Sequence, residues 1–286
     1  MLLESHEEHH FTSIDAGKIL AMFQAYFDES GIQDGASVCL VGGYFGGPGQ
    51  WRKFGQEWQA ILDEYEVPEF HAKQFWAFND YGQRVGPYKG WSATKAETFL
   101  GKLVGVIDSH KKKIHPIGAV LVVEAFNRLT YNQRRFLTGG ALRDGRFVTS
   151  GAPSKPYFLA FQSACLGVAH HAPVGGKAHF AFDLNKNFKG YALDLYSLLK
   201  ETDLKVKGRL GEIAFPTGQE VVQLQAADLF CYLDYQFCKR KVQNKNEQPD
   251  PLLRSVLQGM LSEHDFPFLN DEGLAVVLEG VKLPSG

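Results

Sequence analysis

The sequence predicts an α/β protein with a mixed β-sheet flanked by helices. Short apolar runs typical of strands alternate along the chain with longer amphipathic segments typical of helices. Two of the apolar runs end abruptly on an acidic residue, Asp28 and Asp183. Parallel neighbouring strands need a crossover connection, and a helical segment at 156–170 can supply one between these two runs.

The composition is that of an ordinary globular protein. With 286 residues and a formal net charge of −2, the chain can form one large domain or two small ones. We see no linker or internal repeat, so we expect an N-terminal tail at 1–18 and a single domain with insertions at 19–286. The near-balance of charge means that nucleic-acid binding would have to come from local patches.

The sequence also predicts a cytoplasmic location. The four cysteines form no CxxC pair and lie in apolar surroundings, as expected of reduced thiols. No run approaches the ~18 apolar residues of a membrane span. The first ten residues, rich in Glu and His, lack the basic and apolar regions of a signal peptide. We therefore expect no membrane partner.

The first half of the chain predicts three strands and two long helices. A short link rich in Gly and Asp joins the first two strands and indicates an antiparallel hairpin. Ser92 is the expected N-cap of the second helix. In chain order, these elements are a strand at 19–28, a strand at 36–46, a helix at 50–66, a helix from 92 to about 110 and a strand at 114–123.

The second half begins with a basic segment, 127–155, which is rich in Gly, Ser and Thr and is predicted to be a long loop. Such a segment suits a phosphate backbone, although a solvated surface loop explains it equally well. The remaining predicted elements are helix 156–170, a strand ending at Asp183, helix 187–200, strand 211–216, a helix that starts near 221 and carries Asp228, helix 251–262 and strand 274–278. The last two belong to a C-terminal extension at 241–286.

Three aspartates can meet in this arrangement. If the strands ending at Asp28 and Asp183 are parallel neighbours, both acids lie at the same edge of the sheet. Asp228 lies on the apolar stripe of its helix, four residues after Leu224, and needs a partner there. Carboxylate oxygens suit Mg²⁺ or Mn²⁺, and two such ions can promote phosphodiester cleavage. A structural network without metal is the competing interpretation.

The motifs around these acids resemble the DUF3800 family. They are Tyr26-Phe27-Asp28-Glu29-Ser30-Gly31, the strand ending at Asp183, and Gln223-Leu224-Gln225-Ala226-Ala227-Asp228-Leu229. The resemblance spans roughly residues 20–240. It implies a ribonuclease H-like fold, with a mixed five-stranded sheet that has the first strand at its centre, helices on its faces and helical insertions. It also implies that Asp28, Asp183 and Asp228 bind metal, and that Glu29 contributes as a ligand or as a base that orients water.

Two departures from the ribonuclease H pattern stand out. That enzyme takes a glutamate from the first helix after the hairpins, whereas 156–170 contains no acid here. Glu124, just after the third strand, is a possible replacement. The segment after Asp183 also lacks a second acid, so we expect one ion to bind firmly and the other only with substrate.

The function expected from these features is a metal-dependent nuclease, a hydrolase of nucleic-acid phosphodiester bonds. Asp28, Glu29, Asp183 and Asp228 would be catalytic, with Mg²⁺ or Mn²⁺ as cofactor. The nucleic acid would be bound by the basic residues Arg134, Arg135, Arg143, Arg146, Lys239 and Arg240.

Other parts of the sequence leave alternatives open. Trp76, Phe78 and Tyr81 can stack on unpaired bases, although loop aromatic residues are more often packed. His71 can face a reactive centre, but a packed loop histidine is the simpler interpretation. Two other functions remain: a catalytically inactive nucleic-acid-binding module of a defence or mobile-element system, and a hydrolase of another kind. Adjacent acids on a strand point to opposite faces, so Asp28 and Glu29 do not make a good acid–base pair by themselves.

Overall fold

The structure is a computed structural model. It describes residues 22–143, 146–148, 153–172, 175–183, 187–202, 206, 208–243 and 267–279. The predicted tail at 1–18 and the predicted helix at 251–262 lie outside these described residues.

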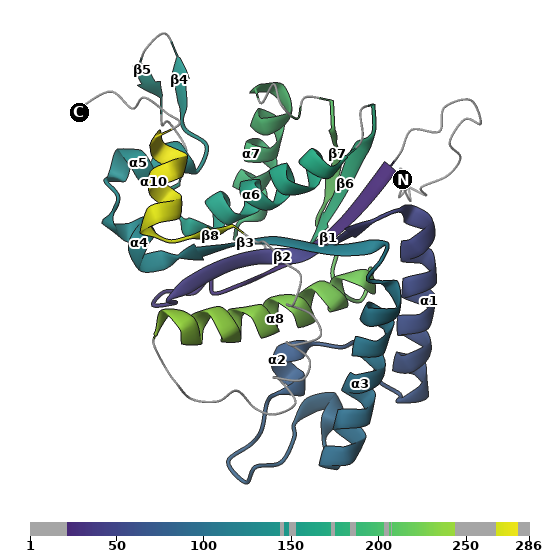
Figure 1. Ribbon diagram of the computed structural model, residues 1–286. Coiled ribbons are helices and arrows are strands. Elements are labelled where there is room, and N and C mark those ends of the chain that lie inside the picture. The colour runs from purple at the N-terminus through teal and green to yellow at the C-terminus, as the bar shows by residue number, and fades with distance from the viewer. Residues whose placement is uncertain are drawn as a thin grey trace, which may run out of the picture.

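The described residues form a six-stranded mixed sheet in the order β7-β6-β1-β2-β3-β8, as Figure 1 shows. β1 is antiparallel to β2, and β2 is antiparallel to β3, whereas the β1–β6, β6–β7 and β3–β8 pairs are parallel. A separate hairpin is formed by β4 and β5. The strands are β1 (Met22–Ser30), β2 (Val38–Gly46), β3 (Ile114–Val122), β4 (Ala141–Arg143), β5 (Arg146–Val148), β6 (Lys177–Phe182), β7 (Leu210–Ala214) and β8 (Phe268–Leu269).

Helices cover both faces of this sheet. In Figure 1, α1, α2, α3 and α8 lie below it and α6 and α7 above it, with α4, α5 and α10 near the β3–β8 end. Among the described residues, no helix is both long and apolar enough to cross a membrane. The helices are α1 (Pro48–Glu64), α2 (Ala72–Phe75), the 3₁₀ helix η1 (Gly86–Tyr88), α3 (Ala93–His110), α4 (Val123–Arg128), α5 (Tyr131–Leu137), α6 (Pro156–His171), α7 (Lys189–Thr202), α8 (Gln223–Val242) and α10 (Asp271–Glu279).

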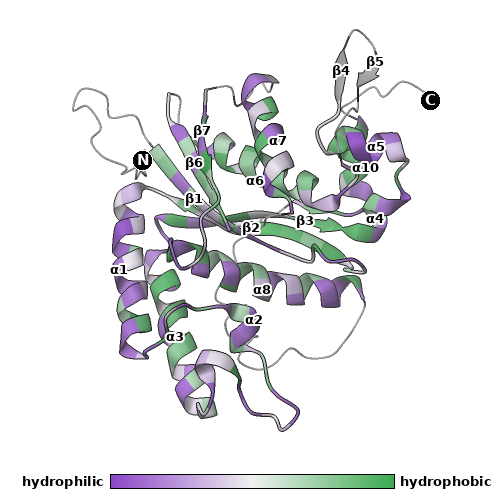
Figure 2. Ribbon diagram, turned by 180° about the vertical axis from the view of Figure 1, so that it is seen from behind, coloured by the Kyte–Doolittle hydropathy of each residue, from purple (hydrophilic) through white to green (hydrophobic). Residues whose placement is uncertain are grey.

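Each face of the sheet has its own hydrophobic core because side chains alternate along the strands. Every residue of β2 is buried, as expected of a strand covered on both sides. Leu40 and Tyr44 pack toward α1, α3 and α8, whereas Phe27 and Val41 pack toward α6 and α7. Figure 2 shows the apolar residues of the strands and the inward sides of the helices together in the interior.

The longest described helix, α8, lies in close contact with the sheet. The Sγ of Cys231 lies 3.2 Å from the backbone oxygens of both Asp28 and Gly42, which share its single S–H donor. A Cβ added at Gly42 would lie 2.6 Å from a ring carbon of Phe230, so only glycine permits this approach. α8 also buries an acid, Asp234, which is 4% exposed.

Most predicted elements are confirmed, with small shifts at their ends. Ser92 caps α3, where its side chain accepts a hydrogen bond from the backbone N–H of Lys95. The strand predicted at 274–278 is wrong, because these residues belong to α10. There, the backbone oxygen and the Oδ1 of Asn270 accept from the N–H groups of Leu274 and Gly273, respectively.

The sequence had suggested a continuous loop at 127–155, and this prediction is wrong. The segment contains the end of α4, all of α5 and the β4–β5 hairpin. A reciprocal capping box between Thr130 and Gln133 starts α5. The many polar residues of this segment thus serve helix and turn formation as well as solvation.

Candidate functional site

Asp28 and Asp183 lie side by side at one edge of the sheet, as predicted. In the parallel β1–β6 pair, Phe27 is opposite Phe182, and the backbone N–H of Asp183 donates to the oxygen of Phe27 at 2.9 Å. Phe27 and Phe182 both face α6 and α7. Because side chains alternate, the two aspartates that follow them belong to the opposite face, which α8 covers.

Asp228 reaches the same place from α8. The contacts of Cys231 with the strands fix this helix directly over Asp28. Asp228 lies three residues earlier, on the same side of the helix. Asp28, Asp183 and Asp228 consequently line one pocket, although they are far apart in the sequence.

The electrostatics of Asp28 reflect this convergence. Burial raises the pKa of its carboxyl well above the ordinary value, and the negative charges of Asp228, Glu29 and Asp183 raise it further. A hydrogen bond from the backbone N–H of Glu29 acts in the opposite direction. The pocket therefore favours either a proton on Asp28 or a cation beside it.

Glu29 lies to one side of the three aspartates. Burial raises the pKa of Cys39 and Tyr157, which belong to the core on the α6 side of the sheet, and the negative charge of Glu29 raises it further. Glu29 still contributes to the pocket wall. This position is the one that alternation along a strand predicts for the residue next to Asp28.

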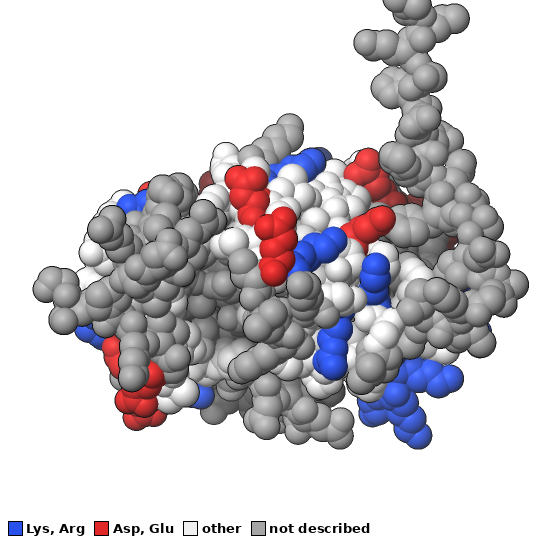
Figure 3. Space-filling model, turned by 90° about the horizontal axis from the view of Figure 1, so that it is seen from above, with Lys and Arg blue, Asp and Glu red and all other residues white. Residues whose placement is uncertain are grey.

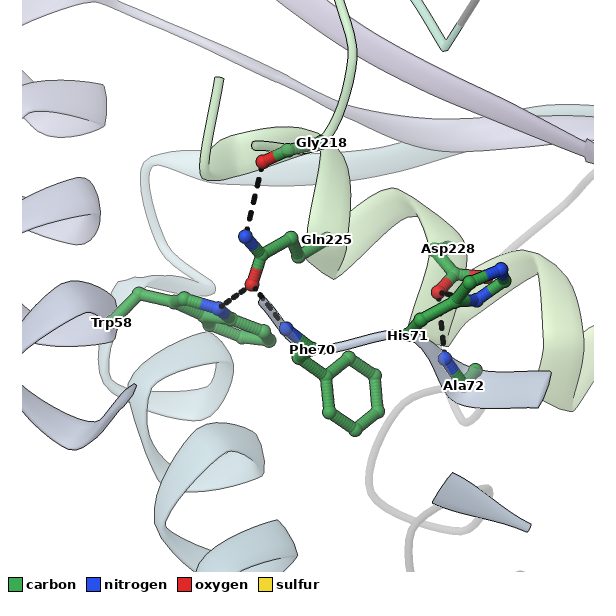
Figure 4. A network of polar contacts seen from close by, with 7 residues as sticks. All are labelled: Trp58, Phe70, His71, Ala72, Gly218, Gln225 and Asp228. Carbon is green, nitrogen blue, oxygen red and sulfur yellow. Dashed lines mark hydrogen bonds and ion pairs between the residues drawn. The ribbon is translucent and has the colours of Figure 1, made fainter. Parts of the chain in front are cut away.

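Asp228 also holds the opposite wall of the pocket in place. Its Oδ2 accepts a hydrogen bond from the backbone N–H of Ala72 at 2.7 Å and lies 3.0 Å from the Nδ1 of His71 (Figure 4). The hydrogen bond between His71 and Asp228 raises the pKa of His71. Burial of the imidazole lowers this pKa, whereas the negative charges of Asp228, Glu69 and Asp183 raise it. The sequence had favoured a packed loop histidine, whereas the structure places His71 in the pocket wall.

Gln225, one turn before Asp228, fixes the same segment. Its Oε1 accepts from the Nε1 of Trp58 and from the backbone N–H of Phe70, both at 3.0 Å. Its Nε2 donates to the oxygen of Gly218 at 3.0 Å (Figure 4). Gln225 is 3% exposed, so these bonds form inside the protein. The glutamine and the aspartate of the motif thus anchor consecutive residues of the chain at 70–72.

The pocket has a volume of about 750 Å³ and an acidic lining. Its lining includes one lysine side chain, Lys73, and the carboxylates of Asp28, Glu29, Glu69, Asp183 and Asp228. Part of the wall is aromatic, since Trp76 stacks on Tyr232 with ring centroids 4.8 Å apart and planes 10° apart.

Carboxylates dominate the charged lining of this pocket. Carboxylate oxygens are the ligands that Mg²⁺ and Mn²⁺ prefer, and a divalent charge would relieve the repulsion that raises the pKa of Asp28. In the described part of the chain, however, no group of three or more His, Cys, Asp or Glu side chains is already arranged to hold a metal ion.

Glu124 is not part of the site. It lies in α4, where its Oε1 pairs with the guanidinium of Arg128 at 2.8 Å, and it does not line the acidic pocket. The expectation that it replaces the missing helix glutamate is therefore not supported by its position.

No described basic side chain of 127–155 lines the acidic pocket, and some of these side chains have structural partners. Arg134 donates to the Oγ of Ser154 at 2.8 Å and to the backbone oxygens of Asn127 and Leu129, both at 2.9 Å. The guanidinium of Arg135 lies over the ring of Tyr131, 5.2 Å from its centroid.

The other basic residues differ in where they lie. Arg143 and Arg146 are the closing pair of the β4–β5 hairpin, and their side chains are outside the described residues. Lys239 lies over the ring of Tyr235, which lines the pocket, whereas one terminal nitrogen of Arg240 is shielded from solvent. On the face seen in Figure 3, the described basic and acidic side chains are interspersed.

The sequence was compared with models of protein families and with curated proteins. No protein-family model matches this sequence, and no curated protein matches it.

Proposed function

We propose that this protein is a metal-dependent nuclease that hydrolyses phosphodiester bonds of nucleic acid. The observation that carries the proposal is the convergence of Asp28, Asp183 and Asp228 on one pocket from a central strand, its parallel neighbour and a helix. Burial together with three neighbouring carboxylates raises the pKa of Asp28, which is the environment expected where a cation binds.

The fold supports the same proposal. The five longer strands of the sheet have β1 at their centre, in the order β7-β6-β1-β2-β3, with helices on both faces. The resemblance to the DUF3800 family and to ribonuclease H implies a five-stranded mixed sheet with the first strand at its centre, whereas the described sheet has a sixth strand, the two-residue β8, beside β3. One fold hosts many activities, so the site carries the functional argument and the fold only agrees with it.

The residues have distinct proposed roles. Asp28, Asp183 and Asp228 would hold Mg²⁺ or Mn²⁺, which, when bound, lowers the pKa of a water and stabilises the leaving oxygen. His71, whose pKa is raised by its hydrogen bond to Asp228, can deliver a proton to the leaving group. Lys73 can pair with a substrate phosphate in an otherwise acidic pocket. Glu29 lies at the side, where it can orient water.

A nucleic-acid-binding module without turnover is the second candidate. It is favoured by the second function of Asp228, whose Oδ2 already receives the N–H of Ala72 and contacts His71. A carboxylate committed to the wall in this way can have a structural role alone. Two measurements on the same protein separate the two candidates.

The first measurement is cleavage. Purified protein is incubated with Mn²⁺ or Mg²⁺ and with end-labelled DNA and RNA, each single-stranded and duplex. We expect Asp28→Asn and Asp183→Asn to reduce cleavage by at least about 100-fold, equivalent to ~3 kcal/mol of transition-state stabilisation. Asp108→Asn, a change at an exposed acid of α3 that pairs with Lys111, is the matched control and should cleave as the wild type does.

The second measurement is Mn²⁺ binding by calorimetry, which does not depend on turnover. The wild type should bind Mn²⁺ and the Asp28→Asn variant should not, with circular dichroism showing that both are folded. Wild-type protein that retards nucleic acid in a gel but neither binds Mn²⁺ nor cuts would establish the binding module. Protein that neither cuts nucleic acid nor retards it in a gel would exclude both candidates.

A further inference from the structure

A short hairpin projects from the segment that forms the pocket wall. Residues 76–84, here called the aromatic hairpin, follow α2 directly, and Phe78 is bridged to Arg84 in antiparallel fashion. Its turn is closed by two backbone hydrogen bonds of 2.9 Å, from the N–H of Asn79 to the oxygen of Gln83 and from the N–H of Gly82 to the oxygen of Asn79.

Side chains stiffen this hairpin. The Oδ1 of Asn79 accepts from the backbone N–H groups of Tyr81 at 3.1 Å and Gln83 at 2.9 Å. The guanidinium of Arg84 lies over the rings of Phe75 and Phe78, 4.6 and 4.9 Å from their centroids, and donates to the backbone oxygen of Phe75. The tip is thus held in one shape by bonds at both ends of the turn.

The stiff tip displays two aromatic side chains to solvent. Tyr81 is 86% exposed and Phe78 is 52% exposed. Neither aromatic side chain takes part in the hydrogen bonds that close the turn, because those bonds use the backbone and the side chains of Asn79 and Arg84. Exposed aromatic rings on a rigid support lose little conformational entropy when they bind a flat partner.

The aromatic hairpin is continuous with the candidate site. Trp76 and Ala77, its first residues, line the acidic pocket, and Trp76 is stacked on Tyr232 of α8. The charge also changes sign here, since residues 72–91 contain Lys73, Arg84 and Lys89 but a single acid, Asp80. A polyanion whose scissile phosphate enters the acidic pocket would therefore extend more favourably over this segment than across the five carboxylates.

We propose that the aromatic hairpin binds unpaired bases of a single-stranded nucleic acid. This inference rests on the proposed function and names its substrate class. Tyr81 and Phe78 stack on bases. Lys73 and Arg84 lie near the sugar–phosphate backbone of the bound strand, which continues toward Asp28. Base faces are available in a single strand but are covered in a duplex, so stacking selects the single strand.

The test measures binding in the absence of cleavage. Full-length protein in EDTA is titrated into fluorescein-labelled oligo-dT and oligo-U of about 12 nucleotides, a length within the range that single-strand-binding domains cover. Fluorescence anisotropy reports the affinity. Tyr81→Ala and Phe78→Ala should each weaken binding about 5- to 150-fold, the range that loss of one stacked base produces. Tyr81→Trp should retain the affinity.

The matched control is Tyr131→Ala. Tyr131 is 57% exposed and has Arg135 over its ring, as Phe78 has Arg84, but it lies on α5 and does not line the pocket. This variant should bind the oligonucleotides as the wild type does. A duplex of the same length should show no dependence on Tyr81, and thermal unfolding should show that every variant is folded.

The outcomes separate this inference from the nuclease proposal. Equal binding of single strands by wild type and by the Tyr81→Ala and Phe78→Ala variants would overturn it, as would an equal loss for single strand and duplex. Weakened single-strand binding in a protein that never cuts with Mn²⁺ would support the hairpin and refute the nuclease. Efficient cleavage without dependence on Tyr81 or Phe78 would do the reverse.

Discussion

Replacing Asp234 by asparagine should remove a pH-dependent penalty from the folded state. Asp234 is buried on α8, where its Oδ1 accepts from the Sγ of Cys238 at 3.6 Å and its Oδ2 has no hydrogen-bond partner among the described residues. Burial raises its pKa from 3.8 to about 6. An acid with a raised pKa destabilises the fold once it ionises, so the penalty begins above the unfolded pKa and is complete above the folded pKa.

The magnitude follows from the shift. Two pKa units correspond to about 3 kcal/mol of unfolding free energy, nearly all of it present at pH 8 and only about 0.5 kcal/mol at pH 4. Asparagine keeps the acceptor for Cys238 and cannot ionise, so the stability difference between Asp234→Asn and the wild type should increase by ~2–3 kcal/mol from pH 4 to pH 8.

Urea unfolding at several pH values measures this change, and a constant effect of the new amide cancels in the comparison. A difference between the two proteins that stays flat from pH 4 to pH 8 would refute the reasoning about Asp234.

Two further substitutions test how α8 is held, again by urea unfolding. Gly42→Ala should destabilise the fold by about 1–3 kcal/mol because the added Cβ would meet Phe230. The control is Gly101→Ala in α3, where the space is open, and it should be neutral or stabilising by up to ~1 kcal/mol. Equal effects of the two substitutions would contradict the close approach of α8. Gln225→Leu should destabilise by about 2–6 kcal/mol because it leaves two buried N–H donors without an acceptor, whereas Gln59→Leu on the surface of α1 should have little effect. A small loss for Gln225→Leu would show that water reaches these donors.

The parts of the fold that the sequence predicted are those with a local signal. The run before Asp28 and the run before Asp183 have strand character, and their parallel pairing follows from the helix between them. The segment 274–278 failed because a short apolar run fits a strand or a buried helix equally well. There, Asn270 was the available cap signal for α10.

The candidate site divides in the same way. The three aspartates were predictable because each lies at a strand end or on the apolar stripe of a helix. The wall formed by His71 and Trp76 was not, because its position depends on α1 to α3 folding back onto α8, and on Gln225 and Asp228 receiving backbone groups from it. No sequence pattern in residues 69–77 predicts those contacts. The basic side chains failed as a guide because charge in a sequence does not reveal which residues, like Arg134, already have partners.

The pairing of β1 with β6 has a consequence for how the protein is made. Asp28 leaves the ribosome 155 residues before Asp183 and 200 residues before Asp228, which at cellular synthesis rates is a delay of roughly 10–40 s for the whole trio. During that time, β1 can pair with β2 on one side, but its other edge has no partner. Because an unpaired strand edge is a template for pairing with other chains, this edge stays open to such pairing until β6 has been synthesised. The acidic pocket can form only after most of the polypeptide has been synthesised.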